Sequence, residues 1–356
     1  MSLRVTWSAR VFAPLLAFSL VLISGATCAQ DAPPQDDTSR DGMPSTETAV
    51  PAGTQDLDAI VVTGRQPGPG LWKVRKGDHV LWILGVESPL PKHMECDSAN
   101  VERKIAASQE VLAAPSATLD ADVGFFRGLT LLPSLLRMRK SPDGKLLRDL
   151  VPPAQYARWE VLKARYIGSD RDVEEWRPLF AALYLYQKAI GRIGLSEDSV
   201  VNDIVRKAAK RSRVPVTDPK VTVKIADPKG ALKTFAGESL DDTACFAKTM
   251  ERIDVDLGGM VERANAWAQG DTETLRTKQG PSQWRACGEA MTSNAAARRL
   301  GFADIEARVQ TAWMAAAEKA LDRNASTFAT LPTSLLFSSD GYLAKLAAKG
   351  YVIEEP

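Results

Sequence analysis

The sequence predicts an α/β (α+β) protein in which a central mixed β-sheet, formed by strands near both termini, carries a large helical middle portion. Short runs of aliphatic and aromatic residues, typical of buried strands, occur early at Leu71–Val74 and Val80–Leu84 and return late at Ser326–Ala329 and Tyr351–Glu354. Apolar residues at helical spacing fill the chain between them. Of the 356 residues, 45% are hydrophobic and 25% are charged, which is ordinary for a soluble globular protein.

The amino terminus has the pattern of a secretory signal peptide. Arg4 and Arg10 precede an apolar run from Val11 to Ile23, and small residues follow as far as Ala29. We therefore expect a signal peptide over residues 1–29 and a secreted, periplasmic protein. The apolar run is short for a membrane span, and no later stretch is apolar enough to be one, so no span is expected after cleavage. Lipidation of Cys28 stays open as an alternative.

A polar segment follows the signal peptide. Residues 30–56 are rich in Pro, Asp, Ser, Thr and Gly and hold almost no large apolar residues. Such a segment cannot bury enough surface to offset its chain entropy, which predicts a disordered linker. The remaining residues, 57–356, are expected to form the folded domain. The net charge of +1 gives no indication of a nucleic acid or an anionic membrane surface as partner.

The domain begins with a predicted strand at Leu57–Thr63 and then a hairpin. Lys76-Gly77-Asp78 connects the first two aliphatic runs, and Gly77 is free to adopt a positive φ. Gly85–Pro89 follows the second run, at the end of a strand where α/β proteins usually place their chemistry.

Apolar periodicity, capping residues and prolines predict the other elements. Helices are expected over residues 97–112, 125–140, 152–162, 172–191, 200–212, 239–267, 281–300, 302–322 and 342–349, with a short one from Asp227-Pro228. Gly258-Gly259 predict a bend or break in the longest of them. Further strands are expected at residues 111–114, 214–216, 221–225 and 334–337, the last after a turn at Pro332.

Three cysteines, Cys96, Cys245 and Cys287, remain once the signal peptide is removed. In an oxidising compartment this odd number means one pair and one free thiol, or no pair. Cys245 and Cys287 lie in two helices whose antiparallel packing would bring their Cα atoms within disulfide reach. We expect this disulfide, with Cys96 as the free thiol; three reduced, buried cysteines are the alternative.

Four stretches carry a resemblance to a known family: Leu71–Pro91, Trp176–Leu185, Asn265–Gly270 and Asp340–Glu354. In their order and spacing the chain resembles the TraB/GumN family, which is related to the Tiki membrane proteases. The resemblance implies two Gly-x-x-His motifs, after strands near each end of the domain, which hold a divalent metal together with acidic residues for peptide hydrolysis. Neutral imidazoles and carboxylates are suitable ligands, and a bound metal activates water.

The residues at the implied metal-binding positions differ from that pattern. The first motif reads Gly85-Val86-Glu87-Ser88, which puts Ser88 at the expected histidine. Counting back from Asp340-Gly341 puts Leu335 at the second histidine and Pro332 at its glycine. Other implied polar positions hold Ala114 or Pro115, Thr217-Asp218-Pro219, and Val309-Gln310 or, with a slip of one residue, Arg308. These differences remove ligand chemistry and keep the apolar residues that form the fold.

The candidates for residual chemistry in this cleft are Gly85, Glu87, Ser88, His93 and Leu335. A serine nucleophile needs a base, and the chain has only two histidines, His79 and His93. Ser88 is more simply a turn residue before Pro89, and His79 an exposed residue at a strand end. His93 is close enough in sequence to Ser88 to serve as a ligand or a proton shuttle.

The sequence therefore favours a secreted relative of metal-dependent peptidases that lacks catalysis, binds no metal or cofactor, and acts as a binding or accessory module for a peptide or small envelope ligand. The alternative is an active hydrolase with a site rebuilt around Glu87, Ser88 and His93. It requires Glu87, His93 and another carboxylate to converge within metal-bonding distance. A purely structural envelope protein is the third hypothesis.

Overall fold

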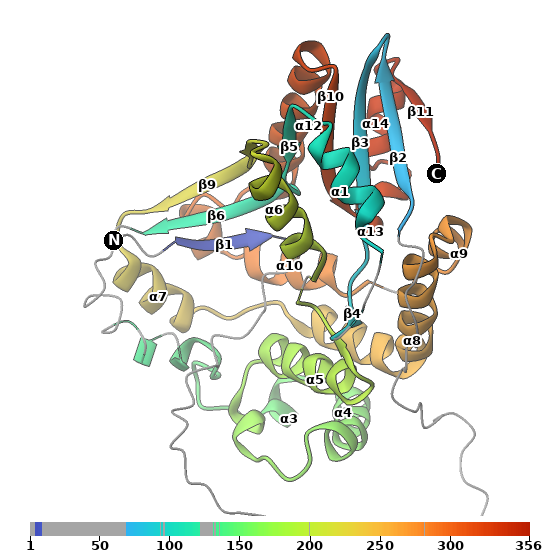
Figure 1. Ribbon diagram of the computed structural model, residues 1–356. Coiled ribbons are helices and arrows are strands. Elements are labelled where there is room, and N and C mark those ends of the chain that lie inside the picture. Colours follow the sequence, from blue (N-terminus) through green and yellow to red (C-terminus); the bar gives the residue numbers. More distant parts are fainter. Residues whose placement is uncertain are drawn as a thin grey trace, which may run out of the picture. The chain divides into compact units, whose positions relative to one another are not determined.

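A six-stranded mixed sheet organises the fold (Figure 1), and its strands come from both ends of the domain in the order β11-β2-β3-β10-β5-β8. The structure, a computed structural model, describes residues 4–8, 69–92, 94, 97–121, 131, 133–134, 136–198, 200–280 and 282–356. The strands of this sheet are β2 (Leu71–Lys76), β3 (His79–Val86), β5 (Glu110–Leu112), β8 (Val216–Thr217), β10 (Ser326–Pro332) and β11 (Val352–Glu354).

Strands from opposite ends of the chain lie side by side in this sheet. β2 and β3 form the expected antiparallel hairpin, with Gly77 at a φ of 59° in its turn. β10 runs parallel to β3 on one side and to β5 on the other. β11 pairs antiparallel with β2 at the edge. The mixed sheet is thus as predicted, and because β3, β5 and β10 run in the same direction, their carboxyl ends meet at one edge.

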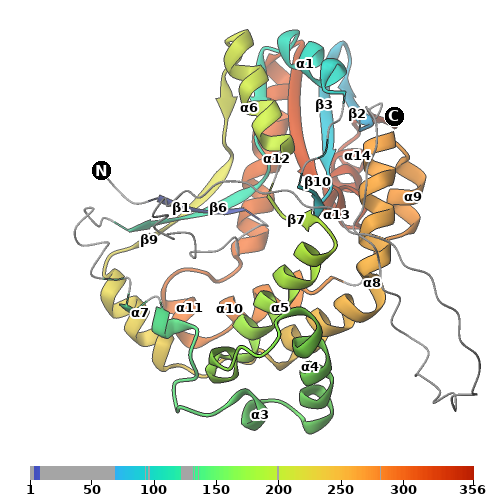
Figure 2. The same cartoon turned by 60° about the horizontal axis from the view of Figure 1, so that its bottom comes forward.

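Helices make up the middle of the chain and most of its last third. They are α1 (Ala99–Ala106), α3 (Leu147–Leu150), α4 (Pro153–Tyr166), α5 (Pro178–Arg192), α6 (Val200–Ser212), α7 (Pro228–Gly237), α8 (Thr243–Gln269), α9 (Thr272–Thr277), α10 (Trp284–Thr292), α11 (Ala295–Arg299), α12 (Ile305–Arg323), α13 (Thr333–Leu336) and α14 (Tyr342–Ala348), with a 3₁₀ helix at Asp172–Glu175. α5 packs along α8, and α4 contacts both of them (Figure 2).

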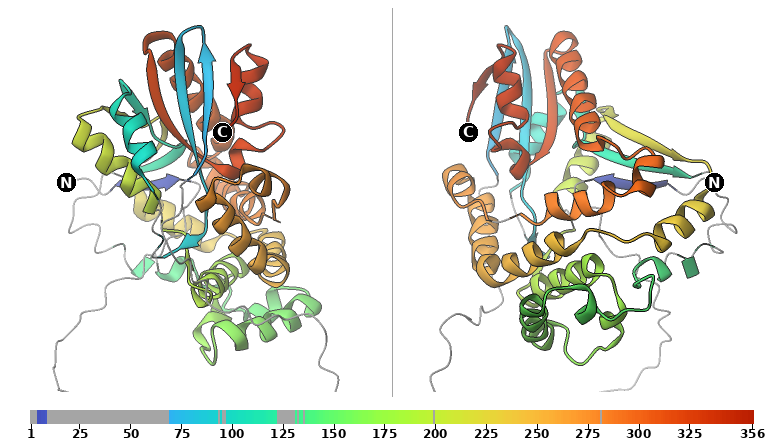
Figure 3. Two further views of the ribbon diagram at one scale, coloured as in Figure 1. Left: turned by 45° about the vertical axis from the view of Figure 1, so that its right-hand side comes forward. Right: turned by 180° about the vertical axis from the view of Figure 1, so that it is seen from behind.

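Both faces of the main sheet are buried. On one face, Leu81 and Ile83 pack with apolar residues of α12 and α14. The alternate residue Leu84, with Phe328 of β10, faces the larger core formed with α1, α5, α6 and α8. This division follows the two-residue period of a strand. Figure 3 shows β2 and β3 between α1 on one side and α14 on the other.

Two smaller sheets complete the fold. A three-stranded sheet has the order β1-β6-β9, with β1 at Arg4–Ser8, β6 at Ser116–Ala121 and β9 at Lys220–Ile225. β4 (Leu90–Pro91) pairs with β7 (Leu195–Ser196). The sequence did not predict β6 or β7, and β1 lies within the segment expected to be the signal peptide.

The predicted strand at residues 334–337 is wrong, because Thr333–Leu336 form the short helix α13. β10 continues to Pro332, which has no N–H for a further ladder bond and whose fixed φ suits the residue before a helix. The apolar run Leu335-Leu336-Phe337 is too short for its pattern to distinguish a strand from a helical turn.

Three predicted helices also differ from the prediction in their boundaries or continuity. α8 runs unbroken through Gly258-Gly259, for a reason given below. The helix expected over residues 281–300 is two helices, because the side chain of Asn294 accepts a hydrogen bond from the backbone N–H of Ala297 and begins α11. The first predicted helix ends at Ala106, before β5.

The strand predicted at Leu57–Thr63, the cleavage site, the linker and half of the residues of the helix predicted over 125–140 lie outside the described residues. So do His93 and Cys96. Among the residues that are described, there is no helix with both the length and the apolar character needed to cross a bilayer.

Candidate functional site

The candidate site lies where β3 and β10 end together. Val86, the last residue of β3, pairs with Pro332, the last residue of β10, so the next residues of the two strands are neighbours. These are Glu87 and Thr333, and the Thr333 hydroxyl donates a hydrogen bond to Oε2 of Glu87. Glu87 is only 7% exposed. The main sheet therefore buries a carboxylate at the edge where the sequence predicted the chemistry.

Helix α8 brings an ion pair to this carboxylate. Arg263 binds Asp256 through two parallel hydrogen bonds, from Nη1 to Oδ1 over 2.9 Å and from Nη2 to Oδ2 over 2.7 Å. Its Nε lies 3.8 Å from Oε1 of Glu87, and its Nη1 also donates to the carbonyl of Lys278. One guanidinium thus lies between two buried carboxylates, in the bidentate geometry that favours arginine at such positions.

A second arginine extends the group. Nη1 of Arg252 donates to Oε1 of Gln283 over 2.7 Å, and its Nε lies 3.7 Å from Oδ2 of Asp256. Arg252 is 7% exposed and Gln283 is fully buried. We refer to Glu87, Arg252, Asp256 and Arg263 as the buried charge cluster.

Two opposing effects act on the Glu87 carboxyl. Burial raises its pKa above the ordinary value because it disfavours the charged form, and this effect is the largest. The Thr333 hydroxyl and the Arg263 guanidinium lower the pKa, but by less than burial raises it. The neighbours therefore compensate only part of the cost of burying the charged form, and the Glu87 carboxyl binds a proton more readily than an exposed glutamate does.

Side chains pack closely around Gly85, which precedes Glu87 by two residues. The indole N–H of Trp267, near the end of α8, donates to the carbonyl of Gly85 over 2.7 Å. A Cβ atom at Gly85 would lie 2.8 Å from the ring of Trp72 and 2.9 Å from Leu336. The first glycine of the motif is thus required by packing against Trp72 and Leu336, whatever the chemistry of the site.

Two glycines next to Asp256, Gly259 in α8 and Gly280 after α9, have a related role. A Cβ atom at Gly259 would lie 2.3 Å from Oδ1 of Asp256 and 3.1 Å from Nη1 of Arg263. One at Gly280 would lie 2.2 Å from Oδ2 of Asp256. Gly259 therefore leaves the space in which an ion pair spanning two helical turns can form, and the helix does not break there.

Of the residues that the sequence proposed for the site, the structure places Glu87 in the buried charge cluster and Gly85 directly below it. Ser88 is half-buried in the loop after β3. Leu335 packs against the apolar cluster that includes Trp72 and Leu336. His93 lies outside the described residues, so its place relative to Glu87 stays a prediction.

The sequence reasoning missed Arg252, Asp256 and Arg263. The signal for them was their spacing of four and seven residues, which places all three on one face of a helix. That face is also apolar, since Ile253, Met260 and Ala264 are buried beside them. Charged residues in register with a buried stripe are rarely buried unless paired, and here they are paired.

The described residues do not fit the divalent metal that the resemblance implies. Among them, no three His, Cys, Asp or Glu side chains gather closely enough to hold a metal ion. The two carboxylates nearest the strand ends, Glu87 and Asp256, face guanidinium groups, which repel a cation, and both oxygens of Asp256 already accept hydrogen bonds from Arg263. The hydrogen bond from Thr333 and the ion pair with Arg263 hold Glu87 in a fixed position.

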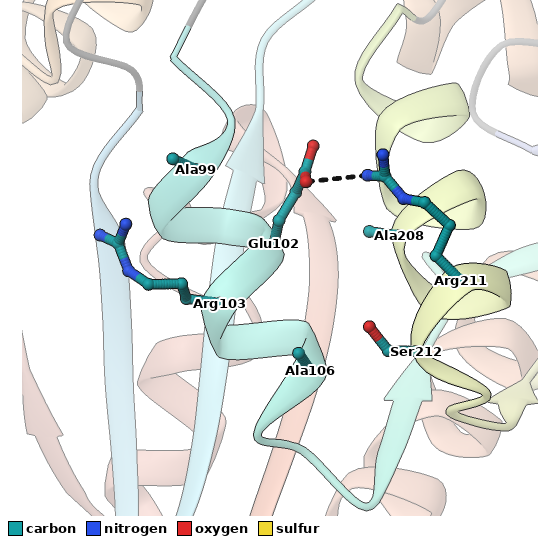
Figure 4. Close-up of a pocket in the computed structure, with 7 residues that line it drawn as sticks. All are labelled: Ala99, Glu102, Arg103, Ala106, Ala208, Arg211 and Ser212. Atoms are coloured by element: carbon teal, nitrogen blue, oxygen red, sulfur yellow. Dashed lines mark ion pairs between the residues drawn. The ribbon is translucent and has the colours of Figure 1, made fainter.

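A shallow groove of about 350 Å³ lies elsewhere, between α1 and α6 (Figure 4). Its lining is mainly small, with Ala99, Ala106 and Ala208, and Arg211 of α6 bridges it to Oε2 of Glu102 over 2.8 Å. Arg103 extends from the other side of α1, away from α6 (Figure 4). The Glu102–Arg211 pair neutralises the two charges that face each other across the groove.

The expected cysteine pair is at bonding distance. The Sγ atoms of Cys245 in α8 and Cys287 in α10 are 2.00 Å apart, and the Cα atoms 4.5 Å apart. Both side chains are buried, together with Leu179 and Leu183 of α5. Gln283 directly precedes α10, so the Cys245–Cys287 link also positions Gln283, whose side chain accepts the hydrogen bond from Arg252.

Comparison with known proteins agrees with the residues that carried the resemblance. The model of the TraB/PrgY/gumN family matches residues 70–355. No curated protein and no solved structure matches the chain. The match covers every strand of the main sheet and the whole buried charge cluster. The chain belongs to the TraB/PrgY/gumN family.

Proposed function

We propose that this protein is an exported, periplasmic member of its family that lacks metal-dependent hydrolysis and acts as a binding or accessory module for a peptide or a small envelope ligand. The observation that carries the proposal is the state of Glu87. Its Oε2 accepts from Thr333, and its Oε1 faces Arg263. A carboxylate that serves as metal ligand or general base needs a free oxygen directed at the metal or the substrate.

The two motif positions support the same proposal. Ser88 and Leu335 stand where the resemblance implies histidines, and neither is a good ligand for a divalent metal. Leu335 instead packs with apolar side chains. The scaffold below them is intact, from the hairpin to the Trp267–Gly85 hydrogen bond. An intact scaffold without the ligand chemistry suits binding better than hydrolysis.

The arrangement at the amino terminus supports export. Arginines, an apolar run and small residues up to Ala29 have the order of a cleavable signal, and a disulfide needs an oxidising compartment to persist. Both features support a folded domain outside the cytoplasm, after a linker over residues 30–56.

A peptide pool distinguishes a binding module from a hydrolase in one experiment. The exported protein is incubated with a pool of synthetic peptides of random sequence, separated by gel filtration, and both fractions are analysed by mass spectrometry. The proposal predicts intact peptides in the protein fraction and no shortened ones in either. Shortened peptides that disappear in a Glu87→Gln variant would instead support the hydrolase with a rebuilt site. No retained peptide at all would favour a purely structural protein.

A further inference from the structure

The edge of β6 carries the further inference. β6 is the middle strand of the three-stranded sheet: β9 pairs parallel with it on one side, and β1 pairs antiparallel on the other (Figure 1). The register with β1 covers five residues, from Arg4 opposite Asp120 to Ser8 opposite Ser116. An extended segment therefore fits this edge along its length.

The segment that fills the edge is also the one expected to be removed. Residues 4–8 lie inside the proposed signal peptide, so cleavage after Ala29 takes β1 away from β6. Without β1, β6 keeps β9 on one side, and its other side presents a row of unpaired N–H and C=O groups, which is a template for another strand. We propose that in the exported protein the free edge of β6 binds an extended peptide segment of a partner, antiparallel to Ser116–Ala121. This inference rests on the proposed export and gives the binding module a second, defined surface.

The register specifies the chemistry of the partner segment. Val5 lies opposite Leu119, and Trp7 opposite Ala117. Leu119 and Ala117 belong to an apolar cluster with Val223 and Ile305. Residues directly opposite each other point to the same face of a sheet, so a partner with apolar residues at alternate positions extends this cluster.

Polar positions on β6 add two further requirements. Asp120 lies opposite Arg4, which favours a basic residue at that end of the partner segment. Thr118 is 2% exposed, and its hydroxyl has no hydrogen-bond partner within the described part of the chain. It lies opposite Thr6, where a polar residue of the partner is within reach across the ladder. The pattern is thus basic, apolar, polar, apolar.

Binding of a defined probe tests the proposal. The probe is a fluorescein-labelled synthetic peptide with the sequence of residues 2–10, SLRVTWSAR, titrated with the exported protein and followed by fluorescence anisotropy. Intact mass spectrometry of the same sample first establishes whether residues 1–29 are absent. If they are present, the proposed export fails and the edge is never opened. If they are absent and saturable binding is seen, the inference is supported.

Backbone methylation shows whether the peptide adds as a strand. Alternate amides of an antiparallel strand point to its neighbour, and the others point away. Two methylated probes are compared, one N-methylated at Val5 and Trp7 and the other at Thr6 and Ser8. The probe that loses two hydrogen bonds to β6 should bind about tenfold or more weakly, and the other should bind nearly as well as the unmethylated probe. The protein is the same in both titrations, so folding cannot explain a difference. Equal effects of the two sets would overturn the proposal.

A matched pair of substitutions tests the register. Asp120→Asn should weaken the probe about threefold, and should have no effect on a probe that carries Arg4→Gln, because both remove the same cross-strand pair. Absence of saturable binding by the cleaved protein would overturn the proposal, whether another segment of the chain or a second copy covers the edge. Light scattering of the peptide-free protein shows whether a second copy covers the edge, because the measured mass is then that of a dimer.

Discussion

The indole of Trp267 donates a hydrogen bond to the carbonyl of Gly85 across 2.7 Å, joining residues that are 182 positions apart in the chain. It connects the end of α8 with the end of β3, the two elements that form the buried charge cluster. Both groups are buried, so neither finds water if its partner is lost.

Trp267→Phe should therefore lower the free energy of unfolding by about 1–3 kcal/mol beyond the lost ring area, because the Gly85 carbonyl stays buried without a donor. The matched control is Trp72→Phe. Trp72 is equally buried, but its Nε1 has no hydrogen-bond partner within the described residues. Urea unfolding of both variants checks this, and equal losses would contradict the role given to the hydrogen bond.

Gly259→Ala should destabilise the protein by about 1–3 kcal/mol, because the added methyl group overlaps the carboxylate of Asp256. Gly258→Ala, at an exposed position of the same helix, should stabilise it by up to about 1 kcal/mol. Thermal unfolding of the two neighbouring variants gives the sign directly. A Gly259→Ala protein as stable as the parent would show that the Asp256–Arg263 ion pair does not need the space at Gly259.

Stability should depend on pH through Glu87. Its pKa is raised in the folded protein above the ordinary value of 4.5, so the folded state holds the proton more tightly than the unfolded state does. The contribution of this group is present below pH 4.5 and is lost as pH rises through the folded pKa. Glu87→Gln should thus become more stable relative to the parent as pH rises, by at most about 1.4 kcal/mol per pH unit.

The control for this pH effect is Glu251→Gln, also on α8. Glu251 is exposed, and its hydrogen bond with Lys248 lowers its pKa. Its stabilising contribution is present above its ordinary pKa and lost as pH falls, so the difference between parent and variant has the opposite sign. Urea unfolding between pH 4 and pH 8 measures both. The same sign for the two variants would contradict the burial effect at Glu87.

Reduction of the Cys245–Cys287 bond should lower the free energy of unfolding by about 4 kcal/mol, since the bond closes a loop with a sequence separation of 42. Cys96→Ser should leave the effect of the reductant unchanged. Thiol counting on the unfolded, unreduced, processed protein should find one free thiol. Three free thiols would refute the pairing.

The sequence predicted the parts of the fold whose signals are local. The hairpin around Gly77 and the edge strand at Val352–Glu354 have strong turn and β-branched patterns, and both formed as expected. Ser116–Ala121 carries no such pattern and becomes a strand through its pairing with β9.

The candidate site was predicted in part. Glu87 follows from its place after a buried strand, which depends on neighbouring residues alone. Its partners Thr333 and Arg263 come from segments more than 150 residues away, and only the pairing of β3 with β10 and the packing of α8 bring them together. Gly259 was misinterpreted because a glycine in a helix suggests a break, whereas its small size here makes room for a distant side-chain pair.

Metal content and peptide cleavage, measured on the same exported sample, test the absence of metal-dependent hydrolysis most directly. The protein is dialysed against Zn²⁺, Mn²⁺ or Co²⁺, its bound metal is determined by elemental mass spectrometry, and it is assayed against unfolded casein beside Glu87→Gln. We predict metal well below one ion per chain and no cleavage by either protein. One bound ion per chain, with cleavage that Glu87→Gln abolishes, would contradict the account.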